Sequence, residues 1–211
     1  MDNQQEQLEA IRDIRTLMER SSRFLPLSGL SGIIIGILAI TCTIVAYSVL
    51  GLSFKETGYP ALIIKNGHLN PSTFPLLFAD FVLVLMASLF TGMMMAMRRA
   101  KKMELPAWDA TAKRLLINLV IPLVAGGIYC LILLYHGHIA LIAPAMLIFY
   151  GLALLNASKY TINDMRYLGI LEIATGLIAS FFSDYGLLFW AFGFGLLHMV
   201  YGIMIYFKYE K

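Results

Sequence analysis

Charged side chains are scarce in this sequence. Asp, Glu, Lys and Arg together make up 14% of the 211 residues, while hydrophobic residues make up 59%. A soluble domain carries about 25% charged residues, so this chain has too few to cover a surface that faces water. The composition therefore excludes an ordinary cytosolic enzyme, a disordered chain and a nucleic-acid-binding domain, and it indicates an integral membrane protein.

Cysteines and catalytic motifs are also scarce. The two cysteines, Cys42 and Cys130, lie within apolar segments, so we expect buried thiols and no disulfide framework. The sequence contains no Walker, GxSxG, HExxH or EF-hand motif, and no two carboxylates are spaced as an acid–base pair. His136 and His138 supply only two of the ligands that a metal site needs. We therefore expect no catalytic activity, no cofactor and no metal centre.

Long apolar runs dominate what remains. A helix needs roughly 20 apolar residues to cross the bilayer core, and the runs are continuous rather than alternating, which excludes a β-barrel. We predict an all-α polytopic membrane protein with a transmembrane domain over residues 28–211. Its six transmembrane helices are predicted at residues 28–52, 73–97, 115–135, 139–156, 165–182 and 185–207.

The placement of basic residues predicts the orientation. If both termini are cytoplasmic, every Lys and Arg except Lys55 and Lys65 falls on the inner side of the six spans. Lys and Arg are retained in cytoplasmic loops, and an odd number of spans would spoil this partition. We therefore predict a multi-pass protein of the bacterial inner membrane with both termini in the cytosol.

Residues 1–27 form a polar leader ahead of the first span. Within residues 2–23, Leu8, Ile11, Ile14 and Met18 fall on one stripe of an amphipathic helix. Two interpretations remain open. The helix lies on the cytoplasmic membrane surface, or it docks a cytoplasmic protein partner or a second copy of the chain.

A basic cluster follows the second span and consists of Arg98, Arg99, Lys101 and Lys102. We expect these side chains to face anionic lipid headgroups on the cytoplasmic side. No fold or motif supports nucleic acid as a partner.

Small residues predict where helices approach each other, because apolar side chains gain little from leaving lipid. The expected helix-packing residues are spaced four or seven apart, at Ser28, Gly32, Gly36, Gly169, Gly176, Gly195 and Gly202. The matching spacing of glycines in residues 29–36 and 169–176 fits either a parallel internal repeat or a chance match.

Ionisable residues within the spans are the candidate functional residues, since charge is costly in lipid. Glu172 and His198 are equidistant from the turn at residue 185 and lie at similar depth, roughly 10–13 Å from the inner ends of their helices. Tyr201 lies one turn from His198 on the same face. The three residues form either a protonatable gate or substrate site, or a structural hydrogen bond between helices.

Asp80 and Asn118 are weaker candidates. Asp80 lies near the outer end of the second span and Asn118 near the inner end of the third. Both positions fit an interfacial side chain as well as a buried one, and we expect Asp80 to be interfacial.

Several segments resemble those of a known group of proteins. The segments are Ile11–Arg15, Met18–Phe24 and Leu27–Gly32 in the first part, and the ending from Leu168 through Gly202 to Glu210. They resemble uncharacterised six-span inner-membrane proteins of Bacteroidota over nearly the whole chain, which implies an inner-membrane location and no particular activity. The glycine-rich apolar spans are also similar in texture to acid-resistance membrane proteins of the HdeD type, with no shared polar motif.

Two functions remain after these arguments. The first is a non-catalytic scaffold, regulator or stress-related component that acts through helix packing and cytoplasmic contacts. The second is a small transporter or channel that uses the Glu172–His198 pair, in which case six spans of this length would suit an oligomer.

Overall fold

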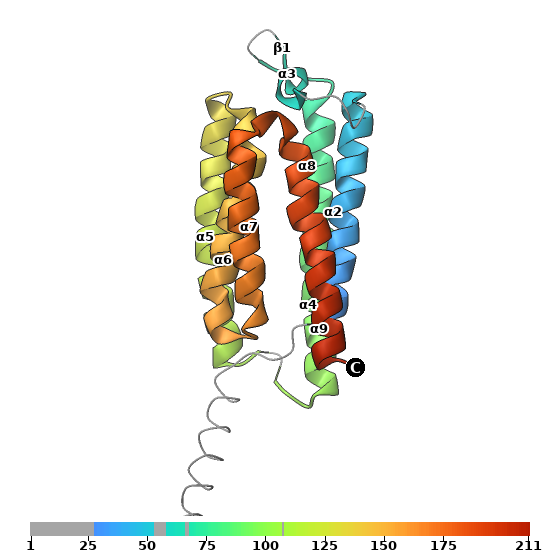
Figure 1. The fold of residues 1–211 in the computed structure, drawn as a ribbon, viewed down its shortest axis with the longest axis vertical. Helices are drawn as coiled ribbons and strands as arrows, with labels where there is room; N and C mark the ends of the chain where they lie inside the picture. Colours follow the sequence, from blue (N-terminus) through green and yellow to red (C-terminus); the bar gives the residue numbers. More distant parts are fainter. Residues whose placement is uncertain (1–27, 53–57, 66–67, 107) are drawn as a thin grey trace, which may run out of the picture.

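The computed structural model describes residues 28–52, 58–65, 68–106 and 108–211, and the predicted helix over residues 2–23 lies outside them. The described chain is almost entirely helical, which agrees with the predicted all-α class (Figure 1). The long helices are α2 (Gly29–Leu50), α4 (Phe74–Lys102), α5 (Ala110–Tyr135), α6 (Ile142–Ala157), α7 (Asp164–Phe181) and α9 (His198–Tyr209).

Short elements extend or connect these helices. Single 3₁₀ turns lie on either side of α6 as η1 (Ile139–Leu141) and η2 (Ser158–Tyr160), and η3 (Ser183–Tyr185) follows α7. The final helix is continuous through α8 (Gly186–Trp190), the π-helical segment η4 (Ala191–Leu197) and α9. At the opposite end from the C-terminus lie α3 (Tyr59–Ile63) and an antiparallel pair, β1 (Ile64–Lys65) and β2 (His68–Leu69).

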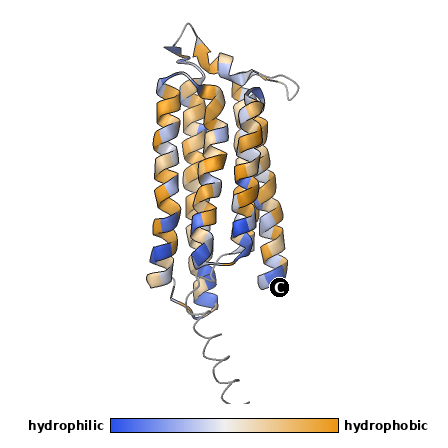
Figure 2. Ribbon diagram, turned by 60° about the vertical axis from the view of Figure 1, so that its left-hand side comes forward, coloured by the Kyte–Doolittle hydropathy of each residue, from blue (hydrophilic) through white to orange (hydrophobic). Residues whose placement is uncertain are grey.

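The helices are apolar over most of their length, with hydrophilic residues gathered mainly near the end that holds the C-terminus (Figure 2). Five helices are long and apolar enough to cross a membrane, namely Gly29–Leu50, Phe74–Lys102, Ala110–Tyr135, Ile139–Tyr160 and Ser183–Tyr209. Large apolar side chains such as Leu83 and Phe90 are 67% exposed. Soluble monomers rarely expose contiguous apolar surface of this kind, so the surface fits a lipid environment.

The helix α7 is not among the five, because its 18 residues include Asp164, Arg166 and Glu172. It nevertheless runs alongside α6 for its full length (Figure 1). The other boundaries differ from the sequence-based ones mainly at the polar ends. Helix α4 continues through the basic cluster to Lys102, and α5 begins five residues earlier than predicted, where the Asp109 carboxylate accepts a hydrogen bond from the backbone N–H of Ala112.

The six helices form two groups of three (Figure 1). In one group α2 packs between α4 and the final helix, and in the other α6 packs between α5 and α7. The groups meet where α8, η4 and α9 contact α6 and α7. Helix α2 is thus the middle helix of its group while α7 is an outer one, so the glycine spacing that they share does not correspond to equivalent positions.

Glycines allow the close approaches within each group. A Cβ atom at Gly202 of α9 would lie 2.6 Å from both the Gly29 carbonyl oxygen and the Ile33 backbone nitrogen of α2. The same holds between α6 and α7, where a Cβ at Gly169 would lie 2.8 Å from the Gly151 carbonyl oxygen. The predicted packing glycines all lie at such contacts, at Gly32, Gly36, Gly169, Gly176, Gly195 and Gly202.

Ser28 differs from this pattern. It precedes α2, and its hydroxyl lies 3.5 Å from a carboxylate oxygen of Glu210, near the end of the chain. Ser28 therefore contributes a polar contact at the end of the helix.

Candidate functional site: a buried glutamate, histidine and tyrosine

Three helices bring Glu172 and His198 together with Tyr150. Glu172 lies midway along α7, His198 begins α9 immediately after the π-helical segment, and Tyr150 projects from the middle of α6. The turn around residue 185 makes α7 and the final helix antiparallel neighbours, so residues at equal distances from the turn meet. A π-helical segment is rare and is often found at a functional site.

The imidazole of His198 joins the other two side chains. Its Nε2 lies 2.7 Å from the Tyr150 hydroxyl, and its Nδ1 lies 3.1 Å from the Gly193 carbonyl oxygen and 3.3 Å from Glu172 Oε1. A carbonyl oxygen only accepts hydrogen bonds, so Nδ1 carries a hydrogen. In the neutral ring Nε2 then accepts from the Tyr150 hydroxyl, and in the imidazolium form it donates to the hydroxyl oxygen.

The carboxyl of Glu172 is the least satisfied group in this cluster. The residue has no exposed surface, and neither carboxyl oxygen has a hydrogen-bond partner of acceptable geometry. An isolated buried carboxylate is very costly, and the cost falls if the group binds a proton or pairs with a cation. Glu172 is therefore either protonated beside a neutral His198 or ionised beside an imidazolium, and the two states differ by the position of one proton.

Gly193 allows the carboxyl to lie against the backbone of the π-helical segment. A Cβ atom at this position would lie 2.5 Å from Glu172 Oε2 and 2.4 Å from a methyl carbon of Leu147. The contact crosses between the two helix groups, because Gly193 belongs to the final helix while Glu172 and Leu147 belong to α7 and α6. The site thus occupies the join between the groups.

Tyr201 lies beside this cluster but does not bond to it. Its buried hydroxyl has no hydrogen-bond partner, although its ring packs with that of Tyr150 against the same apolar cluster of α6 and α7. Tyr150 was not predicted from the sequence. Tyr150 lies about as far from the C-terminal end of α6 as Glu172 lies from the N-terminal end of α7, so a count of residues along the fourth predicted span would have identified it.

The two weaker candidates have structural partners. Asp80 is partly buried one and a half turns into α4, where its carboxylate accepts a hydrogen bond of 3.1 Å from the Cys42 thiol of α2. Its position relative to the membrane interface stays a prediction. The Asn118 side chain donates to the Arg114 carbonyl in its own helix, and its backbone carbonyl accepts from Asn156 of α6.

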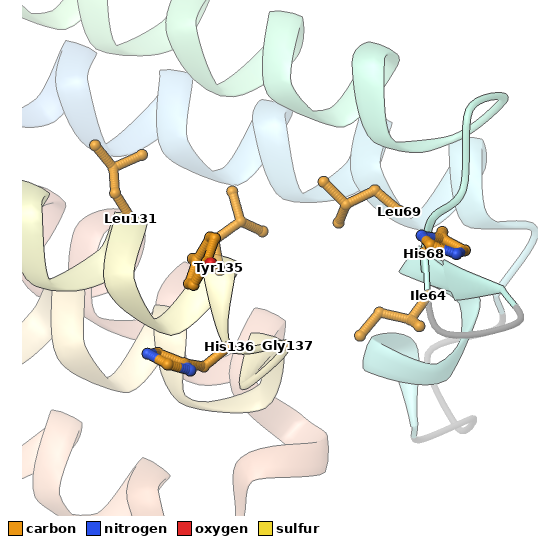
Figure 3. A pocket seen from close by; sticks show the side chains of 8 residues that line it. Ile64, His68, Leu69, Leu131, Tyr135, His136 and Gly137 are labelled. Atoms are coloured by element: carbon orange, nitrogen blue, oxygen red, sulfur yellow. The ribbon is translucent and has the colours of Figure 1, made fainter.

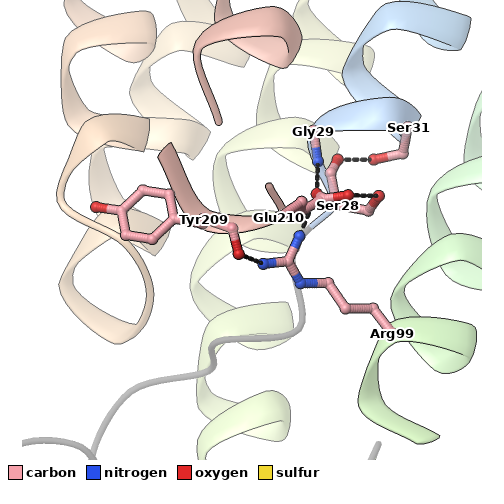
Figure 4. A network of polar contacts seen from close by, with 6 residues as sticks. All are labelled: Ser28, Gly29, Ser31, Arg99, Tyr209 and Glu210. Carbon is pink, nitrogen blue, oxygen red and sulfur yellow. Dashed lines mark hydrogen bonds and ion pairs between the residues drawn. The ribbon is translucent and has the colours of Figure 1, made fainter. Parts of the chain in front are cut away.

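The basic cluster divides into two parts. Arg98, Lys101 and Lys102 are exposed, as lipid contact requires, but only 12% of the Arg99 side chain is exposed. Arg99 forms an ion pair with Glu210 and donates to the Tyr209 carbonyl, and Glu210 also accepts from the backbone N–H of Gly29 (Figure 4). The prediction that Arg99 faces lipid was therefore wrong, because the guanidinium joins the ends of α2, α4 and α9.

A pocket of about 570 Å³ lies at the opposite end of the molecule, between the loop after α5 and the β1–β2 pair (Figure 3). His68 and His136 line it together with Tyr135 and apolar side chains. The ring centroids of His136 and His138 lie 6.5 Å apart. In the described part of the chain, no three His, Cys, Asp or Glu side chains are grouped so that they could hold a metal ion.

Comparison of the chain with models of known protein families, with curated proteins and with solved structures found no match.

Proposed function

We propose that this protein is a proton-linked membrane transporter whose proton-binding centre is the Glu172–His198 pair. The observation that carries the proposal is the carboxyl of Glu172, which is fully buried and has no hydrogen-bond partner for either oxygen. Ionisable groups at membrane depth are rare and often form proton relays. This observation favours transport over the scaffold that the sequence alone placed first.

The proposed centre works by holding or releasing a proton. A protonated Glu172 beside neutral His198 leaves the cluster without net charge, whereas loss of the carboxyl proton to solution leaves an anion in a site with no donor except Nδ1 of the imidazole. Because the carboxyl lies at the join between the helix groups, this added charge favours a different arrangement of α7 and η4. A transporter also needs a site that binds the solute, and in this proposal such a rearrangement exposes that site.

The proposed topology adds α7 to the five long apolar helices as a membrane span, and it has both termini in the cytosol and the bacterial inner membrane as location. Arg98, Lys101 and Lys102 would then bind anionic headgroups on the cytoplasmic side. Residues 2–23 remain a proposed contact for the membrane surface, a protein partner or a second copy. A reporter fused after Lys211 that is active only in the cytosol is the expected result, and activity in the periplasm would refute the orientation.

Infrared difference spectroscopy in nanodiscs tests the proton-binding centre. We expect a carboxyl band that appears or disappears between acidic and basic pH in the wild-type protein and is missing in Glu172→Gln. The matched control is Glu104→Gln, which changes an exposed residue after α4 and should leave that band intact. Absence of a Glu172 band change over the whole range in which the protein stays folded would refute the proposal.

A second measurement separates transport from the scaffold or regulatory role. Proteoliposomes that enclose a pH-sensitive dye are given a pH gradient, and the rate at which it collapses is compared with that of Glu172→Gln proteoliposomes. A faster collapse with the wild-type protein supports transport. A band change without any proton flux would instead indicate a proton-responsive regulator.

A further inference from the structure

Polar side chains continue from Glu172 toward the end of the molecule that holds the C-terminus. On α7, Asp164 precedes Glu172 by eight residues and therefore lies on the same face, about 12 Å away along the helix axis. On the facing helix α9, His198, Tyr201 and Tyr209 follow one another at the spacing of a single stripe. The two stripes run antiparallel and face each other.

The ends of these stripes that lie nearest the C-terminus form a hydrogen-bonded group near the protein surface. The Asp164 carboxylate accepts hydrogen bonds from the Lys208 ammonium at 2.9 Å and from the Tyr209 hydroxyl at 2.9 Å. The Lys208 side chain is 53% exposed. Protons from solution therefore have access to this group, although most of the Asp164 side chain is covered.

Tyr201 lies between the two ends of the polar stripe. Its ring packs with that of Tyr150 against the same apolar cluster of α6 and α7. The Tyr150 hydroxyl in turn is hydrogen-bonded to Nε2 of His198. The Tyr201 hydroxyl is buried without a partner, and a buried hydroxyl of this kind normally bonds to an ordered water.

Neither α7 nor the final helix carries a comparable series from Glu172 toward the opposite end. The remainder of α7, from Ile173 to Phe181, contains no ionisable side chain, and neither does the segment from Gly186 to Leu197 on the facing helix. The next ionisable residue along either helix in that direction is Asp184 or Tyr185 at the turn.

We infer that Glu172 receives its proton from one side only, by a route that starts at Asp164 and passes through Tyr201, Tyr150 and His198. The inference rests on the proposed function, and in the proposed topology the route opens to the cytosol. Tyr201 is a positioning residue for the relay, because it acts through Tyr150 and the imidazole rather than on the Glu172 carboxyl.

The relay balances at each step. The Asp164 carboxylate and its partners Lys208 and Tyr209 take a proton from solution and pass one through a bound water to the Tyr201 hydroxyl. The Tyr201 hydroxyl gives its own proton onward to the Tyr150 hydroxyl through a second bound water. Tyr150 gives its proton to Nε2 of His198, and Nδ1 of the same ring gives its proton to Glu172 Oε1. The net change is one proton lost from solution and one O–H bond formed on the Glu172 carboxylate, with the imidazole left in its Nε2–H tautomer.

The test is the rate at which the Glu172 infrared band responds to a rapid change of pH in nanodiscs. We expect Tyr201→Phe to slow the response by about 100-fold, the lower end of what a positioned proton-transfer group contributes, while the pH midpoint of the band stays the same. Asp164→Asn should also slow it. The matched control is Tyr206→Phe on the same helix, whose side chain is exposed, and Asp184→Asn tests the opposite end.

Each result decides a different claim. Unchanged rates in both Tyr201→Phe and Asp164→Asn, or a slower response in Asp184→Asn alone, would overturn the route but leave Glu172 as the proton-binding group. A shift of the midpoint without a change in rate would assign Tyr201 a structural role only. A wild-type protein with no Glu172 band change would refute both the route and the proposed function.

Discussion

A close contact between α2 and α9 gives a stability prediction that is independent of function. Gly202→Ala places a Cβ atom 2.6 Å from two backbone atoms of α2, the Gly29 carbonyl oxygen and the Ile33 nitrogen. Ordinary contacts begin at 3.4 Å, so α2 and α9 must separate by about 0.8 Å. Backbone atoms cannot rotate away as a side chain does, and the separation affects the whole interface.

The magnitude follows from the loss of packing. A gap of about 0.5–1 Å forfeits roughly a quarter to a half of the dispersion energy of the atoms involved, and overpacking typically costs about 1–3 kcal/mol. Alanine also gains roughly 0.5–1 kcal/mol over glycine in a helix. We therefore expect Gly202→Ala to destabilise the protein by about 1–2 kcal/mol.

Gly127→Ala is the matched control, because a Cβ atom at this position in α5 has no atom within 4 Å. This variant keeps the helix-propensity gain without the collision and should be neutral or slightly stabilising. Unfolding in mixed micelles as the denaturing detergent is increased measures both variants against the wild-type protein. Equal midpoints for the two variants would show that α2 and α9 do not approach as closely as described.

Three further predictions concern other parts of the molecule. Arg99→Ala should destabilise the protein by about 1–3 kcal/mol, because it removes the cationic partner of the partly buried Glu210 carboxylate. Exposed Arg98→Ala should change stability by less than about 0.5 kcal/mol, and detergent unfolding of both variants is the measurement. Gly193→Ala should displace the Glu172 carboxyl and shift its infrared band, and an unchanged band would contradict the described contact. Burial raises the pKa of the Tyr59 phenol, so the neutral phenol stabilises the folded protein fully below about pH 10, and this stabilisation is lost as the phenol ionises at higher pH. Above about pH 10, Tyr59→Phe should therefore unfold less readily than the wild type.

The positions of the helices and the similar depth of Glu172 and His198 could be predicted from apolar runs and residue spacing in the sequence. Long apolar runs predict the helices, because a helix that crosses lipid must carry apolar side chains. Positions 172 and 198 are equally distant in sequence from the tight turn near residue 185, so they lie at the same level in the two helices. Both inferences need only the rise per residue. The approach of Glu172 and His198 to within 3.3 Å is therefore a consequence of hairpin geometry.

Other features depend on how the hairpins pack side by side, which a single sequence does not encode in any local pattern. The bond from Tyr150 to His198 requires α6 to lie beside the final helix, and the ion pair from Arg99 to Glu210 requires the end of α4 to lie beside the end of α9. The π-helical segment has no residue signature either, because glycines and aromatic residues in Ala191–Leu197 are compatible with an ordinary helix.

The location of the site relates its charge to the arrangement of the whole bundle. The glycine contacts of α2 with α9 and of α6 with α7 hold each group together internally, and none of them depends on protonation. The join between the groups contains His198 on one side and Glu172 with Tyr150 on the other. Gain or loss of one proton there alters the attraction across the join while leaving each group intact. A movement of the two groups as rigid bodies is therefore the conformational change that this arrangement favours.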